Sequence, residues 1–179
     1  MKLFEEIPYL ENEYIAIRRI TEDDIEALKE LTENDKVYRY LPTFLFEKQF
    51  DDLYEMLDKL YGEYYETKES IILGIYLKEE DYMCGIAEFY GFKDHLHKVS
   101  IGYRLLERYW GRGIASSAVS LMLKYLLEKT DIEIITASTM VENLASAHVL
   151  EKNGFVKVVA ASTEDWGYDK LTIVDKWIY

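Results

Sequence analysis

"RYWGRGIASSA", Arg108–Ala118, is the stretch that decides the fold. It places Gly111 and Gly113 two residues apart, with Arg108 and Arg112 beside them, directly before a helical pattern of apolar residues. Because glycines remove side chains from the entrance of a helix, the free N–H groups there can approach an anion closely, and the helix dipole favours negative charge. Basic residues oppose that dipole unless an anion is bound. The stretch therefore predicts a helix N-terminus that binds a polyphosphate.

The two glycines also fit other kinds of turn and loop. A tight turn from a strand into a helix also uses glycines, and the residues alone leave that alternative open. A dinucleotide-binding loop has the form G-x-G-x-x-G, but the third position is Ser116. A P-loop ends in Gly-Lys-Ser/Thr, whereas "GIASS" contains no lysine. These two nucleotide-binding motifs are therefore excluded.

The apolar periodicity on both sides of the stretch predicts an α/β fold with a mixed sheet. The expected order is β-α-α-β-β-β-α-β-α-β-β, in one domain that covers residues 1–179. Strands are expected over 14–20, 70–78, 82–92, 98–106, 132–139, 155–162 and 170–179. Helices are expected over 21–34, about 48–66, about 111–129 and 143–152. The run at 132–139 is mostly apolar and β-branched, which predicts a strand covered on both faces.

Three residues give local signals for helix ends. Thr21 with Asp24 three residues later is close to a capping box. Asn143 can cap the short helix that follows it. Gly154 stands where a helix ends on a left-handed residue.

Composition narrows the class of protein. The 179 residues carry a net charge of −13, which argues against a nucleic-acid-binding surface. The charge favours cationic partners, and the alternative is that it serves solubility alone. Cys84 is the only cysteine, so an internal disulfide is impossible and a reduced, cytoplasmic protein is expected. One cysteine and three histidines show no zinc spacing, so we expect no metal. No window has the length of a membrane span, so no membrane partner is expected.

Two motifs carry a family resemblance. Arg108-x-x-Gly111-x-Gly113 resembles the Q/R-x-x-G-x-G/A motif of the GNAT superfamily of N-acetyltransferases. The later run "NLASAHVLEKNGF", Asn143–Phe155, resembles a companion segment of the same superfamily. Together with "IGYRL" upstream, the two motifs are most similar to the RimJ/RimL-like branch, which includes ribosomal-protein N-terminal acetyltransferases.

The resemblance implies a site for acetyl-CoA as cosubstrate. Acetyl-CoA would lie in a V-shaped gap, where the strand ending at Leu106 splays from the strand starting near Ile132. Backbone amides around the two glycines would hold the pyrophosphate, and the strand edge upstream would pair with the pantetheine arm. The residues implied in acetyl-CoA binding are Tyr103, Leu105, Arg108, Trp110, Gly111, Arg112, Gly113, Ile114, Ala115 and Asn143.

The same resemblance implies direct acetyl transfer to a primary amine, without a covalent enzyme intermediate. In much of the superfamily a tyrosine seven residues after the motif asparagine protonates the thiolate, but here that residue is Leu150. Ser146 is the candidate acid; the alternative is an ordinary exposed helix serine. Many relatives of this branch carry glutamate where this chain has Ser100. Glu88 is therefore the candidate base, and the alternative is a solvated strand glutamate.

Three functions stay open at this stage. The first is acetylation of a protein or peptide N-terminus, such as that of a ribosomal protein. The second is acetylation of a small amine such as a polyamine, an amino acid or an aminoglycoside. The third is a catalytically silent CoA-binding module on the same fold. The acceptor is expected to be cationic, the protein a monomer or homodimer, and tyrosines of the second helix to line the acceptor site: Tyr54, Tyr61, Tyr64 and Tyr65.

Overall fold

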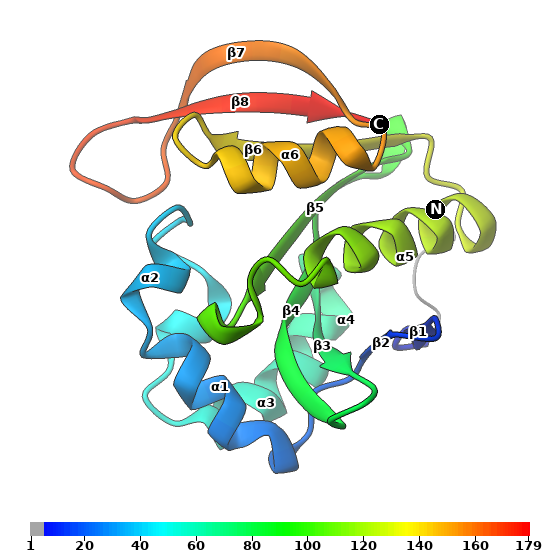
Figure 1. The fold of residues 1–179 in the computed structure, drawn as a ribbon, viewed down its shortest axis with the longest axis vertical. Helices are drawn as coiled ribbons and strands as arrows, with labels where there is room; N and C mark the ends of the chain where they lie inside the picture. Colours follow the sequence, from blue (N-terminus) through cyan, green and yellow to red (C-terminus); the bar gives the residue numbers. More distant parts are fainter. Residues whose placement is uncertain (1–5) are drawn as a thin grey trace.

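The computed structural model describes residues 6–179. Its centre is an eight-stranded mixed sheet (Figure 1). Residues 1–5 of the expected domain lie outside the described part. The strand order is β1-β2-β3-β4-β5-β6-β8-β7. The strands are β1 (Leu10–Glu11), β2 (Ile15–Arg18), β3 (Ser70–Leu77), β4 (Tyr82–Lys93), β5 (Lys98–Leu105), β6 (Ile134–Met140), β7 (Val156–Glu164) and β8 (Thr172–Ile178).

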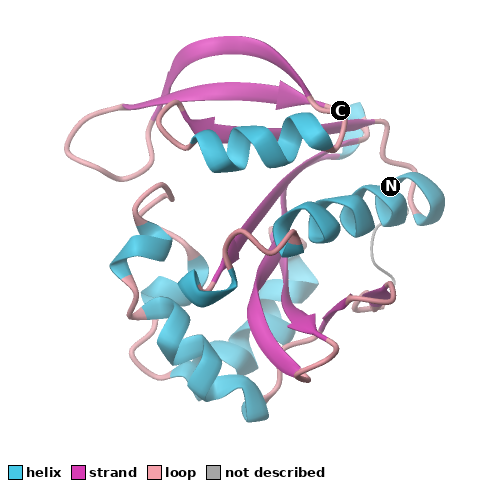
Figure 2. Ribbon diagram, viewed as in Figure 1, coloured by secondary structure: helices cyan, strands magenta, loops and turns pink. Residues whose placement is uncertain are grey.

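Helices, cyan in Figure 2, flank the magenta sheet. They are α1 (Ile25–Thr32), α2 (Asp35–Tyr38), α3 (Leu53–Tyr61), α4 (Glu63–Thr67), α5 (Ile114–Lys129) and α6 (Leu144–Lys152). Helix α5 packs against β1, β2 and β5, while α4 packs against β3. Within residues 6–179, no helix combines the length and the apolar character that crossing a bilayer requires. The expected α/β class and mixed sheet are confirmed, while β1 and α2 are additional to the predicted elements.

The long helix expected over about 48–66 is the main error in the predicted elements. A 3-10 helix covers Phe46–Gln49, and α3 and α4 follow as separate helices. Asp52 begins α3, because its carboxylate accepts a hydrogen bond from the backbone N–H of Tyr54 at 2.8 Å. Gly62 ends α3 with a non-helical backbone. The helical spacing of the apolar residues continues past both Asp52 and Gly62. It therefore does not show that a helix begins at the first and ends at the second.

Strand β6 also differs from expectation. Its residues alternate between buried and half-buried, whereas the sequence predicted a strand covered on both faces. Ile135 and Ala137 are buried, and Thr136 and Ser138 between them are half-buried and line a cavity. One face of β6 is therefore partly open.

The expected splay between two central strands lies between β5 and β6. These strands pair in parallel only where residues 98–100 meet residues 134–136. Beyond Ser100, β5 stays paired with β4 as far as Leu105, while β6 pairs with β8. Figure 1 shows β5 running downward and away from β6. The two strands thus diverge and leave a gap in the middle of the sheet, which we call the splay.

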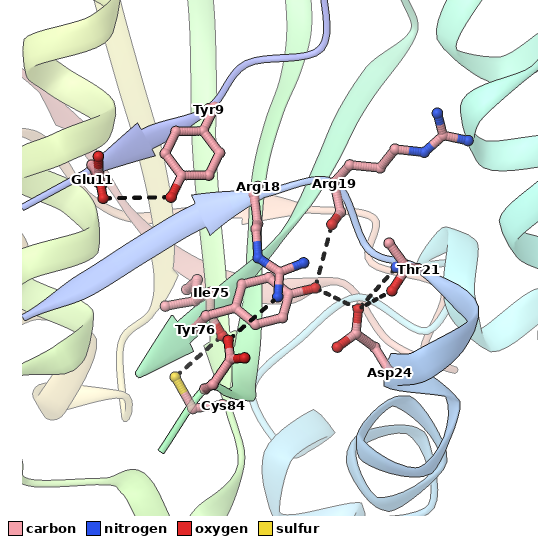
Figure 3. A network of polar contacts seen from close by, with 10 residues as sticks. Tyr9, Glu11, Arg18, Arg19, Thr21, Asp24, Ile75, Tyr76 and Cys84 are labelled. Carbon is pink, nitrogen blue, oxygen red and sulfur yellow. Dashed lines mark hydrogen bonds and ion pairs between the residues drawn. The ribbon is translucent and has the colours of Figure 1, made fainter. Parts of the chain in front are cut away.

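A polar network far along the sheet from the splay ties β2 and β3 to the start of α1 (Figure 3). The buried phenol of Tyr76 donates a hydrogen bond to Asp24 at 2.6 Å, and the Arg18 guanidinium lies 3.5 Å from the centre of the Tyr76 ring. Asp24 also accepts from the backbone N–H of Thr21 at 2.8 Å, which confirms the capping pair predicted from the sequence.

Candidate active site

The exposed backbone of β5 faces the splay. Alternate residues of a strand direct their N–H and C=O groups to the same side. The carbonyl of Val99 accepts a hydrogen bond from Thr136 Oγ1 on β6 at 3.4 Å. Ile101 and Tyr103 therefore direct their backbone groups to the same side, where β6 has already diverged. This strand edge can pair with an extended amide-containing ligand.

A cavity of about 1510 Å³ passes through the splay. Its walls come from the start of α5 and from α6 on one side of the sheet, and from β3, β4 and the segment before α3 on the other. Ten of the twelve residues singled out in the sequence line it: Glu88, Tyr103, Leu105, Trp110, Gly111, Gly113, Ile114, Ala115, Asn143 and Ser146. Arg108 and Arg112 are not among the lining residues.

The turn before α5, in which two glycines carry no side chain, has the geometry of an anion-binding site. Gly111 and Gly113 have φ angles of +71° and +77°, which favour glycine. A β-carbon on either residue would have no described atom within 4 Å, so this backbone faces open space. Helix α5 begins at Ile114, three residues later than expected, because the two glycines are left-handed. We call the turn Trp110–Gly113 with the first residues of α5, Ile114 and Ala115, the cradle.

Carboxylates from other elements neutralise the two arginines beside the cradle. Arg108 pairs with Glu30 of α1, and this hydrogen bond raises the pKa of Arg108. Arg112 pairs with Glu80 at 3.5 Å. Glu30 and Glu80 thus offset part of this positive charge within the protein, so the two arginines do not by themselves require a bound polyphosphate.

Trp110 covers the end of β5. Its indole Nε1–H donates a hydrogen bond to the carbonyl of Leu105 at 2.9 Å. The side chain is 47% exposed, so Trp110 is no core residue. The Leu105 carbonyl is already paired, which leaves the backbone of Ile101 and Tyr103 to face the splay.

Helix α6 forms the other wall of the splay. The Asn143 side chain accepts a hydrogen bond from the backbone N–H of Ser146 at 3.2 Å, which confirms the predicted cap. Gly154 follows the helix with a φ angle of +90°, as its position predicted. Leu150 is 1% exposed and packs into the core. The residue in the position of the superfamily tyrosine is thus buried and has no hydroxyl group.

The side chain of Tyr103 reaches from β5 to α6. Its phenol oxygen lies 2.8 Å from Ser146 Oγ, and the phenol also donates to the Ser146 carbonyl at 3.3 Å. Burial raises the pKa of Tyr103 to about 12. Ser146 is half-buried, so it is not the ordinary exposed helix serine considered as the alternative. The sequence had singled out Tyr103 for its backbone only.

Glu88 lies on the opposite face of the sheet, in a buried ionic cluster. It is 8% exposed, so it is not the solvated strand glutamate considered as the alternative. Its carboxylate accepts from Ser70 Oγ at 2.6 Å and from Arg104 Nη1 at 3.0 Å. Arg104 also donates to Glu47 at 2.6 Å. Two carboxylates share one guanidinium, so acidic groups outnumber basic groups in this cluster.

Aromatic side chains line the same end of the cavity as Glu88. Phe46 and Tyr64 stack with ring centres 4.2 Å apart, and both line the cavity. Among the four tyrosines expected at the acceptor site, only Tyr64 is a lining residue. The Tyr61 phenol instead donates to the Ile72 carbonyl at 2.9 Å. This end of the cavity therefore combines flat apolar walls with an acidic group.

The sheet is split between β5 and β6. The cradle lies at one end of this split, and the acidic, aromatic end of the cavity lies at the other. This is the arrangement of an acyl-CoA-dependent transferase. The family comparison agrees with this class. Residues 15–156 match the acetyltransferase (GNAT) domain model, and the chain belongs to this family of N-acetyltransferases.

The chain is similar to one curated protein over most of its length, and to two solved structures in its fold. An uncharacterized N-acetyltransferase of Bacillus subtilis, YoaA, is 28% identical over 150 residues, which cover 84% of each chain. A solved RimL ribosomal L7/L12 alpha-N-protein acetyltransferase, in complex with coenzyme A, has a TM-score of 0.78 and 19% identity over 96% of this chain and 97% of its own. A spermidine N-acetyltransferase from Vibrio cholerae, in complex with CoA and spermine, has a TM-score of 0.76 and 17% identity over 94% and 96%.

Proposed function

We propose that this chain transfers an acetyl group from acetyl-CoA directly to a primary amine. The observation that carries the proposal is the cradle, a left-handed double-glycine turn that opens into a cavity through the splay. Such a turn exposes the first N–H groups of a 16-residue helix to an anion. Two solved neighbours of this fold hold coenzyme A, which supports the same ligand here.

We assign the binding of acetyl-CoA to the cradle, the β5 edge and α6. The backbone N–H groups of the cradle hold the pyrophosphate, and the dipole of α5 adds to their attraction. The backbone of Tyr103 and the N–H of Leu105, whose carbonyl is already bonded to Trp110, pair with the pantetheine arm, and the Asn143 amide supplies a further hydrogen bond. Arg108 and Arg112 add positive charge near the phosphates, reduced by their carboxylate partners.

The acceptor amine approaches through the aromatic end of the cavity. The excess of carboxylates over guanidinium groups in the Glu47–Arg104–Glu88 cluster favours a cationic acceptor. We assign proton removal from the incoming ammonium to Glu88, directly or through water, since it is the buried carboxylate that lines this part of the cavity. Its hydrogen bonds from Ser70 and Arg104 fix its orientation.

The two substrates meet at the splay. A free N–H of β5 near Tyr103 can donate to the thioester oxygen as negative charge develops on it, which is the kind of preorganised contact that stabilises such charge well. The hydroxyl groups of Ser146 and Tyr103 stand on the α6 side, where the thiolate would leave. The chain thus offers groups for each proton that the transfer must move.

For the acceptor we propose a protein or peptide N-terminus, as in the RimJ/RimL-like branch that the sequence motifs resemble. The RimL neighbour is named for acetylation of a ribosomal protein. The alternative is a small amine, and a neighbour that acts on spermidine supports it. We further propose that residues 1–179 act as one cytoplasmic domain, as a monomer or homodimer, without a metal.

The test is release of free thiol from acetyl-CoA in the presence of N-terminal peptides, polyamines, amino acids and aminoglycosides. Saturable release with one class of amine supports the proposal and names the acceptor. Tight acetyl-CoA binding without release for any amine would instead establish the catalytically silent module, which Leu150 and Ser100 keep in consideration.

A further inference from the structure

The Tyr103–Ser146 hydrogen bond is a contact that neither sequence motif explains. The side chains of neighbouring strand residues point to opposite faces of a sheet. The Arg104 side chain binds Glu88 on the face of the sheet opposite to α6. The Tyr103 side chain therefore points to the face that α6 covers. There it crosses the splay and places a phenol against Ser146, with both residues on the cavity wall.

We propose that Tyr103 supplies the proton that the leaving thiolate takes up, and that Ser146 positions its phenol. The proposal rests on the proposed function, because it needs thioester cleavage in the splay. The tyrosine that performs this step in much of the superfamily would stand on α6 at Leu150, which is buried and carries no acidic hydrogen. Tyr103 brings the same functional group to α6 from β5.

The phenol is chemically better suited to the step than the serine hydroxyl. A phenol has an ordinary pKa of about 10 and a thiol one of about 8.5, so a phenol is much closer in acidity to the thiol it must form than an aliphatic hydroxyl is. An aliphatic hydroxyl is a far weaker acid. Burial raises the pKa of Tyr103 to about 12, so the phenol carries its proton at neutral pH. The hydrogen bond with Ser146 acts in the other direction and lowers this pKa, because it stabilises the phenolate that remains after transfer.

The step balances in atoms and charge. The amine lone pair forms the C–N bond, the C–S bond breaks, and its electron pair stays on sulfur. The proton passes from the Tyr103 oxygen to that sulfur and gives the free thiol. The incoming ammonium loses two protons in all: one to Glu88 or water before the attack, which frees the lone pair, and one to water after the C–N bond has formed. The Tyr103 phenolate then regains a proton from solvent in the cavity, by way of the Ser146 hydroxyl.

The experiment compares two tyrosine variants with the wild type. Tyr103→Phe removes only the phenol oxygen; it should lower kcat for thiol release by about a hundredfold or more, the effect of a positioned acid. The KM and the calorimetric Kd of acetyl-CoA should stay within about twofold, because proton donation matters only in the transition state. Tyr76→Phe also removes a buried phenol oxygen, that of the polar network in Figure 3. Tyr76 is not among the residues that line the cavity, so this variant should leave kcat unchanged.

Two serine variants test the positioning role. Ser146→Ala should lower kcat by about two- to tenfold, the worth of one hydrogen bond, with acetyl-CoA affinity unchanged. Ser146→Thr keeps a hydroxyl and should restore most of the rate. These two variants also decide the proposal should Tyr103→Phe fail to fold: an unchanged kcat in Ser146→Ala would overturn it.

The outcomes separate this inference from the proposed function. No thiol release by the wild type with any amine contradicts the proposed function itself. An active wild type with kcat unchanged in a folded Tyr103→Phe overturns only the role of Tyr103. A larger loss of kcat in Ser146→Ala than in Tyr103→Phe would also overturn it, and would make Ser146 the proton donor.

Discussion

Replacing Gly113 by alanine should separate the anion-binding role of the cradle from its contribution to stability. The φ angle of +77° costs an L-residue about 1–2 kcal/mol in the left-handed region. The new β-carbon meets no described atom within 4 Å, so no clash adds to that cost. We therefore expect the free energy of unfolding to fall by about 1–2 kcal/mol and Tm by about 2–8 °C.

The effect on acetyl-CoA should be much larger. The β-carbon occupies the open space in front of the cradle N–H groups, so the phosphate oxygens cannot reach hydrogen-bonding distance. Two lost charge-assisted hydrogen bonds, at about 1.5–3 kcal/mol each, amount to a hundredfold or greater loss of affinity. Valine, which is larger and β-branched, should abolish binding. Isothermal titration calorimetry with acetyl-CoA, alongside thermal unfolding, measures both effects.

Gly154→Ala is the matched control. Gly154 has a φ angle of +90° and is not among the cavity-lining residues, so an alanine there carries similar backbone strain outside the site. Its β-carbon would lie 3.3 Å from the Tyr179 ring, a contact that a small shift relieves. Affinity for acetyl-CoA should stay at the wild-type value. Wild-type affinity in a folded Gly113→Ala protein would refute the assignment of the cradle.

Four further predictions concern single side chains. Asn143→Ala should weaken acetyl-CoA binding by about 1–2 kcal/mol and also lower Tm, because a hydrogen bond and a helix cap are both lost; a lower Tm with unchanged affinity in calorimetry would leave Asn143 only as a cap. Glu88→Gln should lower kcat about a hundredfold with acetyl-CoA affinity retained, and a wild-type rate would exclude it as the base. Burial raises the pKa of Cys84 to about 12, so a thiol reagent at neutral pH should label it only on unfolding, and rapid labelling of the native protein would contradict its burial. The hydrogen bond from Lys157 holds the pKa of Asp175 below its ordinary value of 3.8. The stability that this ion pair adds is fully present above pH 3.8 and is lost as the pH falls through the lower pKa of the folded protein. Asp175→Asn should therefore lower Tm at pH 7 and have a smaller effect on Tm in strong acid. An equal change of Tm at the two pH values would refute the ionic role.

The backbone of the site was predictable from the sequence because it depends on local signals. The double glycine predicted a helix entrance without side chains, and Asn143 predicted the cap of the next helix; both are present, although the left-handed conformation of the two glycines starts the helix three residues later than expected. Apolar periodicity predicted about where β5 ends and β6 begins. The family resemblance predicted that the two strands diverge there. The split of the helix expected over 48–66 depends on Asp52 and Gly62, whose effect an apolar stripe does not report.

The side-chain partners were not predictable, because they are distant in the sequence. Arg108 pairs with Glu30, which lies on α1, 78 residues earlier in the sequence. Tyr103 forms a hydrogen bond with Ser146, which is 43 residues away in the sequence. Strand alternation places Tyr103 and Arg104 on opposite faces, but it does not say which helix covers each face. That arrangement comes from tertiary packing, and it decides which hydroxyl and carboxyl groups line the cavity.

The most direct test of direct acetyl transfer follows the acetyl group itself. The wild-type protein is incubated with isotopically labelled acetyl-CoA and the amine identified by thiol release, and the acceptor and protein are weighed by mass spectrometry. The account predicts one labelled acetyl group on the amine for each thiol released, and no acetyl group on the protein at any time. Thiol release without an acetylated amine, or label held covalently by the protein before it reaches the amine, would contradict it.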